Sequence, residues 1–226
     1  MFRASIFDFD GVIIDSEVLH LRAFNGSLVP FGVEIATKDY YQQYLGFSDF
    51  DCYKALVDDG LLKVEERQIG DIIKRKSEIF EELVRTEGQT IEGVPEFLKM
   101  LEQNEIPMAI CSGALLAEIE LMLDGAHLRH FFRTIVSAEQ VKKGKPDPEG
   151  FLLALERLND DCKPPLTADQ CVVIEDSHWG LQAANAAGMH TIAVTNSYDA
   201  GQLTAAEKVV ALLSDLSMAD LERLCS

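Results

Sequence analysis

The sequence predicts an α/β protein whose core is a Rossmann-like, doubly wound parallel sheet. Short apolar runs, each bounded by polar or turn residues, are typical of strands buried on both faces. They lie at residues 4–7, 108–111, 134–136, 171–174 and 191–194. Segments with apolar residues at helical spacing lie between them, at residues 95–101, 149–158 and 180–187. Because the two kinds of segment alternate, we expect right-handed crossover connections and parallel strands.

One long stretch breaks this alternation. Residues 16–88 contain no convincing buried strand, whereas residues 18–24 and 69–84 have helical patterns. We therefore expect a helical insertion over residues 16–88 that follows the first strand and forms a helix-rich lid on an α/β core. The α/β core is expected to comprise residues 1–15 and 89–226.

Charge and cysteine content restrict the possible partners and compartment. The chain has 226 residues and a formal net charge of −18, which disfavours nucleic acid and anionic membranes because both require basic surfaces. Five cysteines without the spacing of a zinc or redox motif, and an N-terminus without a signal-peptide pattern, favour the cytoplasm. A monomer is the default expectation for a capped protein of this kind.

The first predicted strand ends in the sequence Asp8-Phe9-Asp10-Gly11. Residues two apart on a strand point to the same face, so Asp8 and Asp10 bring two carboxylates together. Their repulsion and desolvation are costly unless a cation or a shared proton compensates. An Asp-x-Asp sequence by itself is equally compatible with a functional site and with a solvated turn.

Two further polar clusters follow later in the chain. Ser112 and Gly113 come after the second predicted strand, where they can present a hydroxyl and backbone amides to a phosphate, or where Ser112 can cap a helix. Lys145 lies in a basic loop at residues 142–148 that two prolines stiffen. A lysine there can neutralise a phosphate and a neighbouring carboxylate, although a solvated loop is the simpler interpretation of this segment alone.

Glu175 and Asp176 form a second acid pair after the fourth predicted strand, and Ser177 is placed to cap the next helix. A small set of oxygen ligands with open positions favours Mg²⁺ over Zn²⁺. Ligands of open α/β sheets bind beyond the carboxyl ends of the strands. The four clusters are therefore expected to converge on one crevice.

In order and spacing, these clusters resemble the four motifs of the haloacid dehalogenase superfamily. The residues that carry the resemblance are Asp8-Phe9-Asp10-Gly11-Val12, Ser112-Gly113, Lys145-Pro146-Asp147-Pro148 and Glu175-Asp176-Ser177. The helical insertion at residues 16–88 resembles the small α-helical cap of the group that contains β-phosphoglucomutase, phosphoglycolate phosphatase and CbbY-like phosphatases, and residues 180–189 strengthen this placement. The resemblance implies that this cap domain is a lid that determines substrate specificity. The resemblance covers essentially the whole chain.

The resemblance implies that Asp8 attacks phosphorus to form an aspartyl phosphate, and that Asp10 protonates the leaving oxygen and then activates water. It implies Mg²⁺ as the cofactor, held by Asp8, the Asp10 backbone carbonyl and Asp176, with Glu175 assisting directly or through water. The implied phosphate-binding residues are Ser112, Gly113 and Lys145. An acid at position 10 is absent from the dehalogenases and phosphonatases, so its presence favours a phosphate ester as the substrate.

Two residues of the expected cap, His20 and Lys76, resemble cap residues of β-phosphoglucomutase. The competing interpretations are a surface or hinge histidine and a lysine on a solvated helix, and the sequence slightly favours the latter for Lys76. Asp49 stands where the mutase has an arginine that would hold a second phosphate, and Ser112 is not followed by the mutase's lysine and asparagine. We therefore predict a phosphatase for a small phosphate monoester, such as a sugar phosphate.

Several alternatives remain open at this stage. A phosphosugar mutase is the nearest, followed by a catalytically idle phosphate-binding or signalling protein. Receiver domains also combine aspartates, Mg²⁺ and lysine, but the Asp-x-Asp sequence and the helical insertion disfavour that class. His178 is expected to face solvent, and Trp179, the only tryptophan, is expected to be a packing residue.

Overall fold

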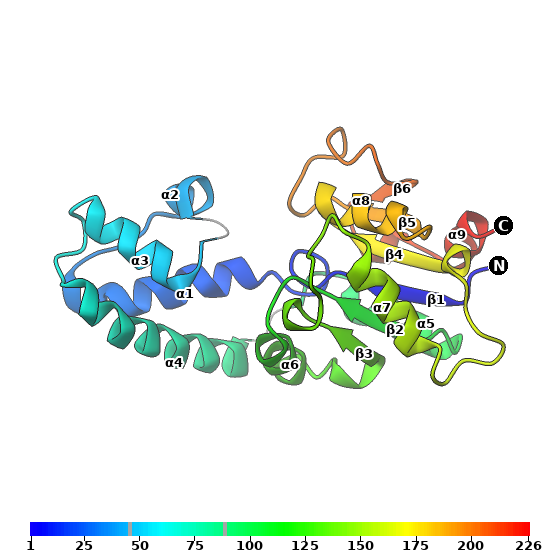
Figure 1. Cartoon of the computed structure of the whole chain (residues 1–226), viewed down its shortest axis with the longest axis horizontal. Coiled ribbons are helices and arrows are strands. Elements are labelled where there is room, and N and C mark those ends of the chain that lie inside the picture. The colour runs from blue at the N-terminus through cyan, green and yellow to red at the C-terminus, as the bar shows by residue number, and fades with distance from the viewer. Residues whose placement is uncertain (45–46, 88–89) are drawn as a thin grey trace. The chain divides into compact units, whose positions relative to one another are not determined.

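A computed structural model describes residues 1–44, 47–87 and 90–226. The chain forms two compact units (Figure 1). The core unit comprises Met1–Asp15 and Gln89–Ser226, and the helical unit comprises Ser16–Gly88.

The core unit contains a six-stranded sheet in the order β3-β2-β1-β4-β5-β6, and each neighbouring pair is parallel. The strands are β1 (Ala4–Phe7), β2 (Met108–Cys111), β3 (Phe132–Val136), β4 (Cys171–Glu175), β5 (His190–Val194) and β6 (Lys208–Val210). The strand order runs outward from β1 in both directions, which is the mark of a doubly wound sheet. The predicted fold class of the core is confirmed.

Helices cover this sheet, as Figure 1 shows for α7 and α8. They are α5 (Val94–Gln103), α6 (Leu116–Gly125), α7 (Glu149–Leu158), α8 (His178–Ala186) and α9 (Met218–Leu224). α7 packs on β2 and β3, and α8 packs on β4 and β5. Every residue of β1 and β4 is buried because helices or neighbouring strands surround both strands on all sides. This explains why these strands have continuous apolar runs rather than alternating ones.

Four strands of the core differ from the prediction. β4 and β5 are each one residue longer than expected, and β3 and β6 differ more. β3 begins at Phe132, two residues earlier than expected, since its second residue, Arg133, is exposed and interrupts the apolar run. β6 was not predicted, because its three residues are only half-buried at the edge of the sheet. A short strand of this kind carries little hydrophobic signal.

The helical unit has an apolar core of its own. It contains α1 (Ser16–Leu28), α2 (Thr37–Asp39), a π-helical turn (Tyr40–Tyr44), α3 (Asp49–Asp58) and α4 (Ile69–Glu87). α1 packs along α4, and α3 also contacts α4. Tyr53 is fully buried, and its hydroxyl lies 2.6 Å from the Ser27 hydroxyl. The unit therefore has the buried aromatic centre of a separately packed domain, with Phe24 in edge contact with Tyr53.

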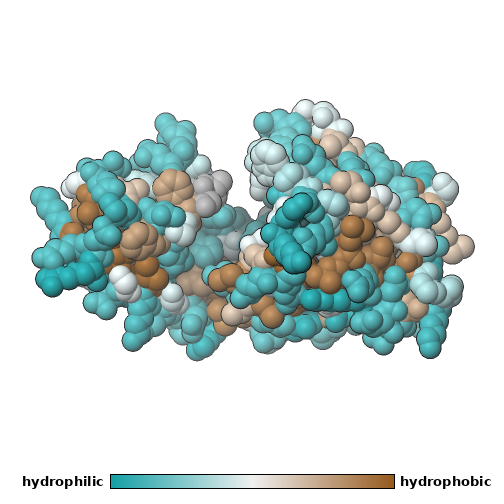
Figure 2. Space-filling view, viewed as in Figure 1, coloured by the Kyte–Doolittle hydropathy of each residue, from teal (hydrophilic) through white to brown (hydrophobic). Residues whose placement is uncertain are grey.

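Short 3₁₀ helices join the main elements in both units. They are Val29–Phe31, Glu66–Gln68, Arg129–Phe131, Ala138–Gln140, Ala168–Gln170 and Leu213–Asp215. Figure 2 shows hydrophilic side chains over much of the visible surface of each unit, in keeping with the net charge of −18. None of the helices in the described part of the chain is both long and apolar enough to cross a membrane.

The two segments that leave and re-enter the core unit lie side by side. Ile14 forms an antiparallel bridge with Thr90, and the backbone amide of Ile91 donates to the carbonyl of Ile13 at 3.0 Å. Before this point, the chain turns sharply after β1. The backbone amides of Val12, Ile13 and Ile14 all donate to the Phe9 carbonyl, and Gly11 adopts a φ of +74°. This left-handed conformation favours glycine at position 11.

Candidate active site

Asp8 lies directly beyond the carboxyl end of β1, the strand from which the sheet extends in both directions. Its backbone amide donates to the Ile174 carbonyl at 2.9 Å, so the residue continues the pairing of β1 with β4. Its side chain is 13% exposed. The neighbouring strands β2 and β4 end beside it, which brings the predicted clusters that follow those strands to the same edge.

Lys145 links two of these clusters. Its Nζ donates to Oδ1 of Asp8 at 2.7 Å and to Oε1 of Glu175 at 2.5 Å. The same ammonium lies 5.1 Å from the centre of the Phe151 ring, on α7. The side chains of Lys145 and Glu175 are 16% and 0% exposed, so these ion pairs are shielded from water. The lysine therefore crosses from its loop to the ends of both central strands.

The other oxygen of Glu175 organises the loop that follows β4. Oε2 accepts from the backbone amides of Asp176 and Ser177, at 3.0 and 3.1 Å, and from the Ser177 hydroxyl at 2.9 Å. Ser177 also caps α8, as predicted, by accepting from the Gly180 amide at 3.1 Å. A Cβ at Gly180 would lie 1.7 Å from Oε1 of Glu175. Position 180 must therefore be glycine for Glu175 to reach Lys145.

Burial and mutual charge shift the pKa values of this site. Burial raises the pKa of Asp8 well above its usual value, and the charge of Glu175 adds to the effect while Lys145 opposes it. Burial by itself would lower the pKa of Lys145, but the charges of Asp8 and Glu175 outweigh it and raise that pKa. Burial also raises the pKa of Asp176, to about 6, against the hydrogen bond from Ser197. The site thus holds more negative charge than its lysine neutralises.

This donor set fits a divalent metal ion. Asp8, Glu175 and Asp176 are buried, and each offers a carboxylate oxygen within 4.8 Å of the others. Three carboxylates against one ammonium leave an excess of buried negative charge, which a cation would offset. Among the described residues, this is the one group of three or more acidic, histidine or cysteine side chains with such spacing.

Asp10 lies outside that group of three carboxylates. It sits in the turn after β1, where its backbone bridges to Ile14. Its charge nevertheless contributes to the raised pKa of Asp176, so the two side chains interact electrostatically. The structure therefore places Asp10 near the cluster.

Ser112 follows β2, and its amide donates to the Val136 carbonyl of β3 at 2.9 Å. Its hydroxyl is buried and accepts from the Ala114 amide at 3.0 Å. The expectation that Ser112 caps a helix is wrong, because α6 begins only at Leu116. No atom lies within 4 Å of where a Cβ of Gly113 would stand. The backbone at this position is therefore open to a ligand.

Sequence reasoning missed two residues of the site, Asn196 and Ser197. Both follow β5 and contact the other loops, through hydrogen bonds to Gly11 and Asp176. The pair Asn196-Ser197 has no distinctive sequence pattern, so only its position after a predicted strand pointed to it. Trp179 was predicted to be a packing residue and is instead 58% exposed.

The predicted cap residues form a cluster within the helical unit. Nζ of Lys76 donates to Oδ1 of Asp49 at 2.7 Å and lies 3.0 Å from Nδ1 of His20, whose ring stacks on Phe80. Lys76 is 3% exposed, so the slightly favoured expectation of a solvated lysine is wrong. Burial and the charge of Lys76 lower the pKa of His20 to about 3, which makes this histidine neutral near pH 7.

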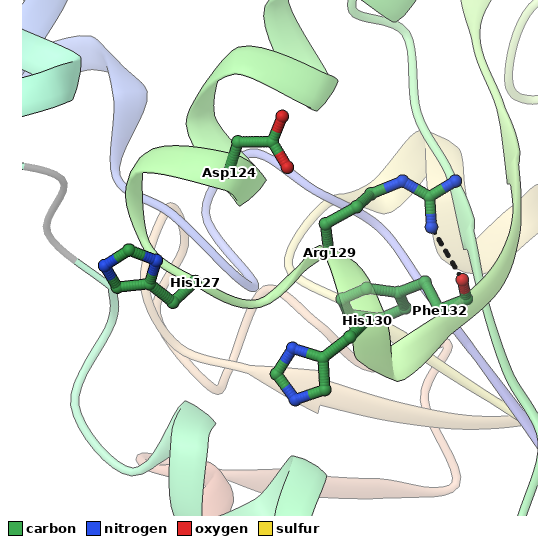
Figure 3. A pocket seen from close by; sticks show the side chains of 5 residues that line it. All are labelled: Asp124, His127, Arg129, His130 and Phe132. Atoms are coloured by element: carbon green, nitrogen blue, oxygen red, sulfur yellow. Dashed lines mark hydrogen bonds between the residues drawn. The ribbon is translucent and has the colours of Figure 1, made fainter.

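A separate pocket of about 510 Å³ is lined by Asp124, His127, Arg129, His130 and Phe132 (Figure 3). Its side chains do not converge: Figure 3 shows the two imidazole rings and the Asp124 carboxylate pointing in different directions. The Arg129 guanidinium is bound to the Phe132 carbonyl at 2.7 Å and to Glu120. This pocket lacks the convergent polar groups of a catalytic site.

Two known phosphatases are similar to this chain. A phosphorylated carbohydrates phosphatase from Thermotoga maritima is 31% identical over 217 residues, which are 93% of this chain and 94% of that protein. A chloroplastic 5-amino-6-(5-phospho-D-ribitylamino)uracil phosphatase from Arabidopsis thaliana is 35% identical over 157 residues; these make up 70% of this chain but only 40% of that longer relative.

Among solved structures, CbbY from Rhodobacter sphaeroides in complex with phosphate superposes with a TM-score of 0.75 and is 26% identical, covering 98% of this chain and 100% of that one. The family model of haloacid dehalogenase-like hydrolases matches residues 5–194, a span that includes both acid pairs, Ser112 and Lys145. The chain belongs to the haloacid dehalogenase-like hydrolase family.

Proposed function

We propose that this protein is a Mg²⁺-dependent phosphatase that hydrolyses a small phosphate monoester through an aspartyl phosphate on Asp8. The observation that carries the proposal is the placement of Asp8: a buried carboxylate at the end of the central strand, 2.7 Å from the Lys145 ammonium and grouped with Glu175 and Asp176. Phosphatase relatives and the family match support the reaction type.

In the first step, a carboxylate oxygen of Asp8 attacks phosphorus, and the bond between phosphorus and the ester oxygen breaks. Asp10 gives its proton to the departing oxygen, so the alcohol leaves neutral. In the second step, Asp10 takes a proton from water as the water oxygen attacks phosphorus. The bond to Asp8 breaks, and inorganic phosphate is released.

Charge neutralisation is the main task of the remaining residues. Lys145 binds oxygens of the transferring group, together with the Ser112 hydroxyl and the Gly113 amide. Mg²⁺ would be held by Asp8, Asp176 and the Asp10 carbonyl, where it would neutralise charge on the phosphoryl oxygens. Glu175 has both oxygens bound to protein donors, so we assign it to holding Lys145 and the β4 loop, with any contact to the ion made through water.

We further propose that the helical unit selects the substrate. The buried ammonium of Lys76 is already paired with Asp49 and contacts His20, which leaves little positive charge for a second phosphate. This favours hydrolysis of a monophosphate over a phosphosugar mutase, whose cycle passes through a bisphosphate. A mutase remains the second candidate.

The test is phosphate release from p-nitrophenyl phosphate and from a panel of sugar phosphates and other small phosphate esters, with and without Mg²⁺. Asp8→Asn should abolish turnover, while the matched control Asp124→Asn, in the exposed pocket of Figure 3, should not. Full activity of Asp8→Asn would contradict the proposal. With glucose 1-phosphate as the substrate, isomerisation without phosphate release would identify a mutase instead.

A further inference from the structure

The loop after β5 holds two other loops of the site. Thr195 is anchored by its amide, which donates to the Val210 carbonyl of β6 at 3.2 Å. The next residue, Asn196, donates from Nδ2 to the Gly11 carbonyl at 2.7 Å. Ser197 then donates from its hydroxyl to Oδ2 of Asp176. Two consecutive side chains thus bind the turn after β1 and the loop after β4.

The contact among these groups is close. A Cβ at Gly11 would lie 1.9 Å from Oδ2 of Asp176 and 3.1 Å from the Ser197 hydroxyl oxygen. Asp176 is only 4% exposed, so its carboxylate is packed between the turn and the serine. Its Oδ2 is occupied by this hydrogen bond, which fixes the plane of the carboxylate and therefore the direction of Oδ1.

We propose that Ser197 and Asn196 are positioning residues for the divalent cation: Ser197 orients Asp176, and Asn196 fixes the turn that carries the Asp10 carbonyl. This inference rests on the proposed function, in which Asp176 and that carbonyl are cation ligands. Carboxylates that bind metals are held by a further hydrogen-bond donor, and loss of such a donor typically weakens metal affinity by roughly 10–100-fold. Neither residue contacts the substrate in this role.

The experiment compares equilibrium Mg²⁺ binding by the 226-residue chain and its variants, measured by calorimetry and by the fluorescence of Trp179. This is the only tryptophan, is 58% exposed and lies three residues after Asp176. Ser197→Ala should weaken Mg²⁺ binding by about 10–100-fold. Ser197→Thr keeps a hydroxyl and should retain most of the affinity. Asn196→Ala provides a second variant that leaves Ser197 in place, and it too should weaken binding.

Ser217→Ala is the matched control. The Ser217 hydroxyl also donates to a carboxylate, Oδ2 of Asp220, at 2.6 Å. Ser217 and Asp220 lie far from both acid pairs in the sequence, and Asp220 is also bound to Lys208. It should leave Mg²⁺ affinity unchanged. Thermal unfolding in EDTA shows which variants are folded before binding is compared.

The outcomes separate this inference from the proposed function. If the wild-type protein binds no Mg²⁺ and releases no phosphate, the proposed function fails. If the wild-type protein binds Mg²⁺ and folded Ser197→Ala and Asn196→Ala bind it equally well, the positioning role is overturned while the phosphatase proposal stands. With saturating Mg²⁺, phosphate release by Ser197→Ala should recover towards the wild-type kcat. A kcat that stays low at every Mg²⁺ concentration, together with an unchanged affinity for Mg²⁺, would also overturn the inference.

Discussion

Replacement of Lys145 by methionine removes the ammonium group while keeping a side chain of similar length. In the folded protein, this leaves the carboxylates of Asp8 and Glu175 without the partner that binds them at 2.7 and 2.5 Å. Glu175 is 0% exposed and Asp8 is 13% exposed, so water cannot take over the lost contacts. Removing one partner of such a buried ion pair costs about 3–5 kcal/mol.

The matched control is Lys143→Met, in the same loop. The Lys143 side chain is 73% exposed and its Nζ lies 3.5 Å from Asp147, so its loss should change the free energy of unfolding by no more than about 0.5 kcal/mol. Urea unfolding of both variants in EDTA near neutral pH measures the difference, because EDTA prevents a divalent ion from replacing the ammonium.

The loss in Lys145→Met should shrink as the pH falls. Burial already raises the pKa of Asp8, and removing Lys145 removes the influence that opposes this rise. Asp8 therefore binds a proton more readily in the variant, and the proton cancels the uncompensated charge. A loss below about 1 kcal/mol, or one no larger than that of Lys143→Met, would refute the view that the carboxylates depend on this lysine.

Three further predictions concern single side chains. Burial raises the pKa of Asp176 from 3.8 to about 6, so the folded protein binds this proton more tightly than the unfolded chain does. In urea unfolding without divalent ions, the stability of the wild type relative to Asp176→Asn should therefore fall by roughly 3 kcal/mol as the pH rises from about 4 to about 7. Gly180→Ala places a Cβ 1.7 Å from Oε1 of Glu175, the oxygen that binds Lys145. Because the new Cβ displaces Glu175, kcat in a phosphate-release assay should fall at least about 10²-fold. Tyr53→Phe removes the hydroxyl 2.6 Å from Ser27 and should cost about 1–3 kcal/mol of unfolding free energy, measured in urea.

Each of these predictions has a result that would contradict it. An Asp176 difference that stays constant across the pH range, or rises with pH, would mean that this carboxyl is not buried as described. Gly180→Ala with wild-type kcat would mean that Glu175 can move without loosening Lys145. A Tyr53→Phe variant as stable as the wild type would mean that the buried hydroxyl pair contributes no net stability.

The sequence was most informative where burial is complete. β1 and β2, in which every residue is buried, have the predicted bounds. α7 begins and ends at the predicted residues because its apolar residues recur at helical spacing. The expected convergence of Asp8, Lys145, Glu175 and Asp176 followed from their positions at or near the ends of predicted strands, since parallel strands end at one edge of a sheet. The hydrogen bonds among these side chains could not be predicted, because they depend on the conformation of each loop.

Side chains whose partners are distant in the sequence were the hardest to predict. Lys76 has the sequence context of an exposed helical lysine, and it is buried because Asp49 and His20 approach it from other helices. Ser197 is one of many serines in the chain, and only the fold brings it to Asp176, 21 positions earlier. The local sequence pattern carries no information on such pairings, because tertiary packing determines them.

The pairing of Ile14 with Thr90 makes the helical unit replaceable. Because the chain leaves and re-enters the core unit at adjacent points, segments of different length can be exchanged between them without pulling apart the loops of the candidate site. The entropy cost of closing such a loop rises only slowly with its length. If the helical unit selects the substrate, as proposed, substrate preference can diverge by exchange of one continuous stretch of chain, while the residues around Asp8 stay in place.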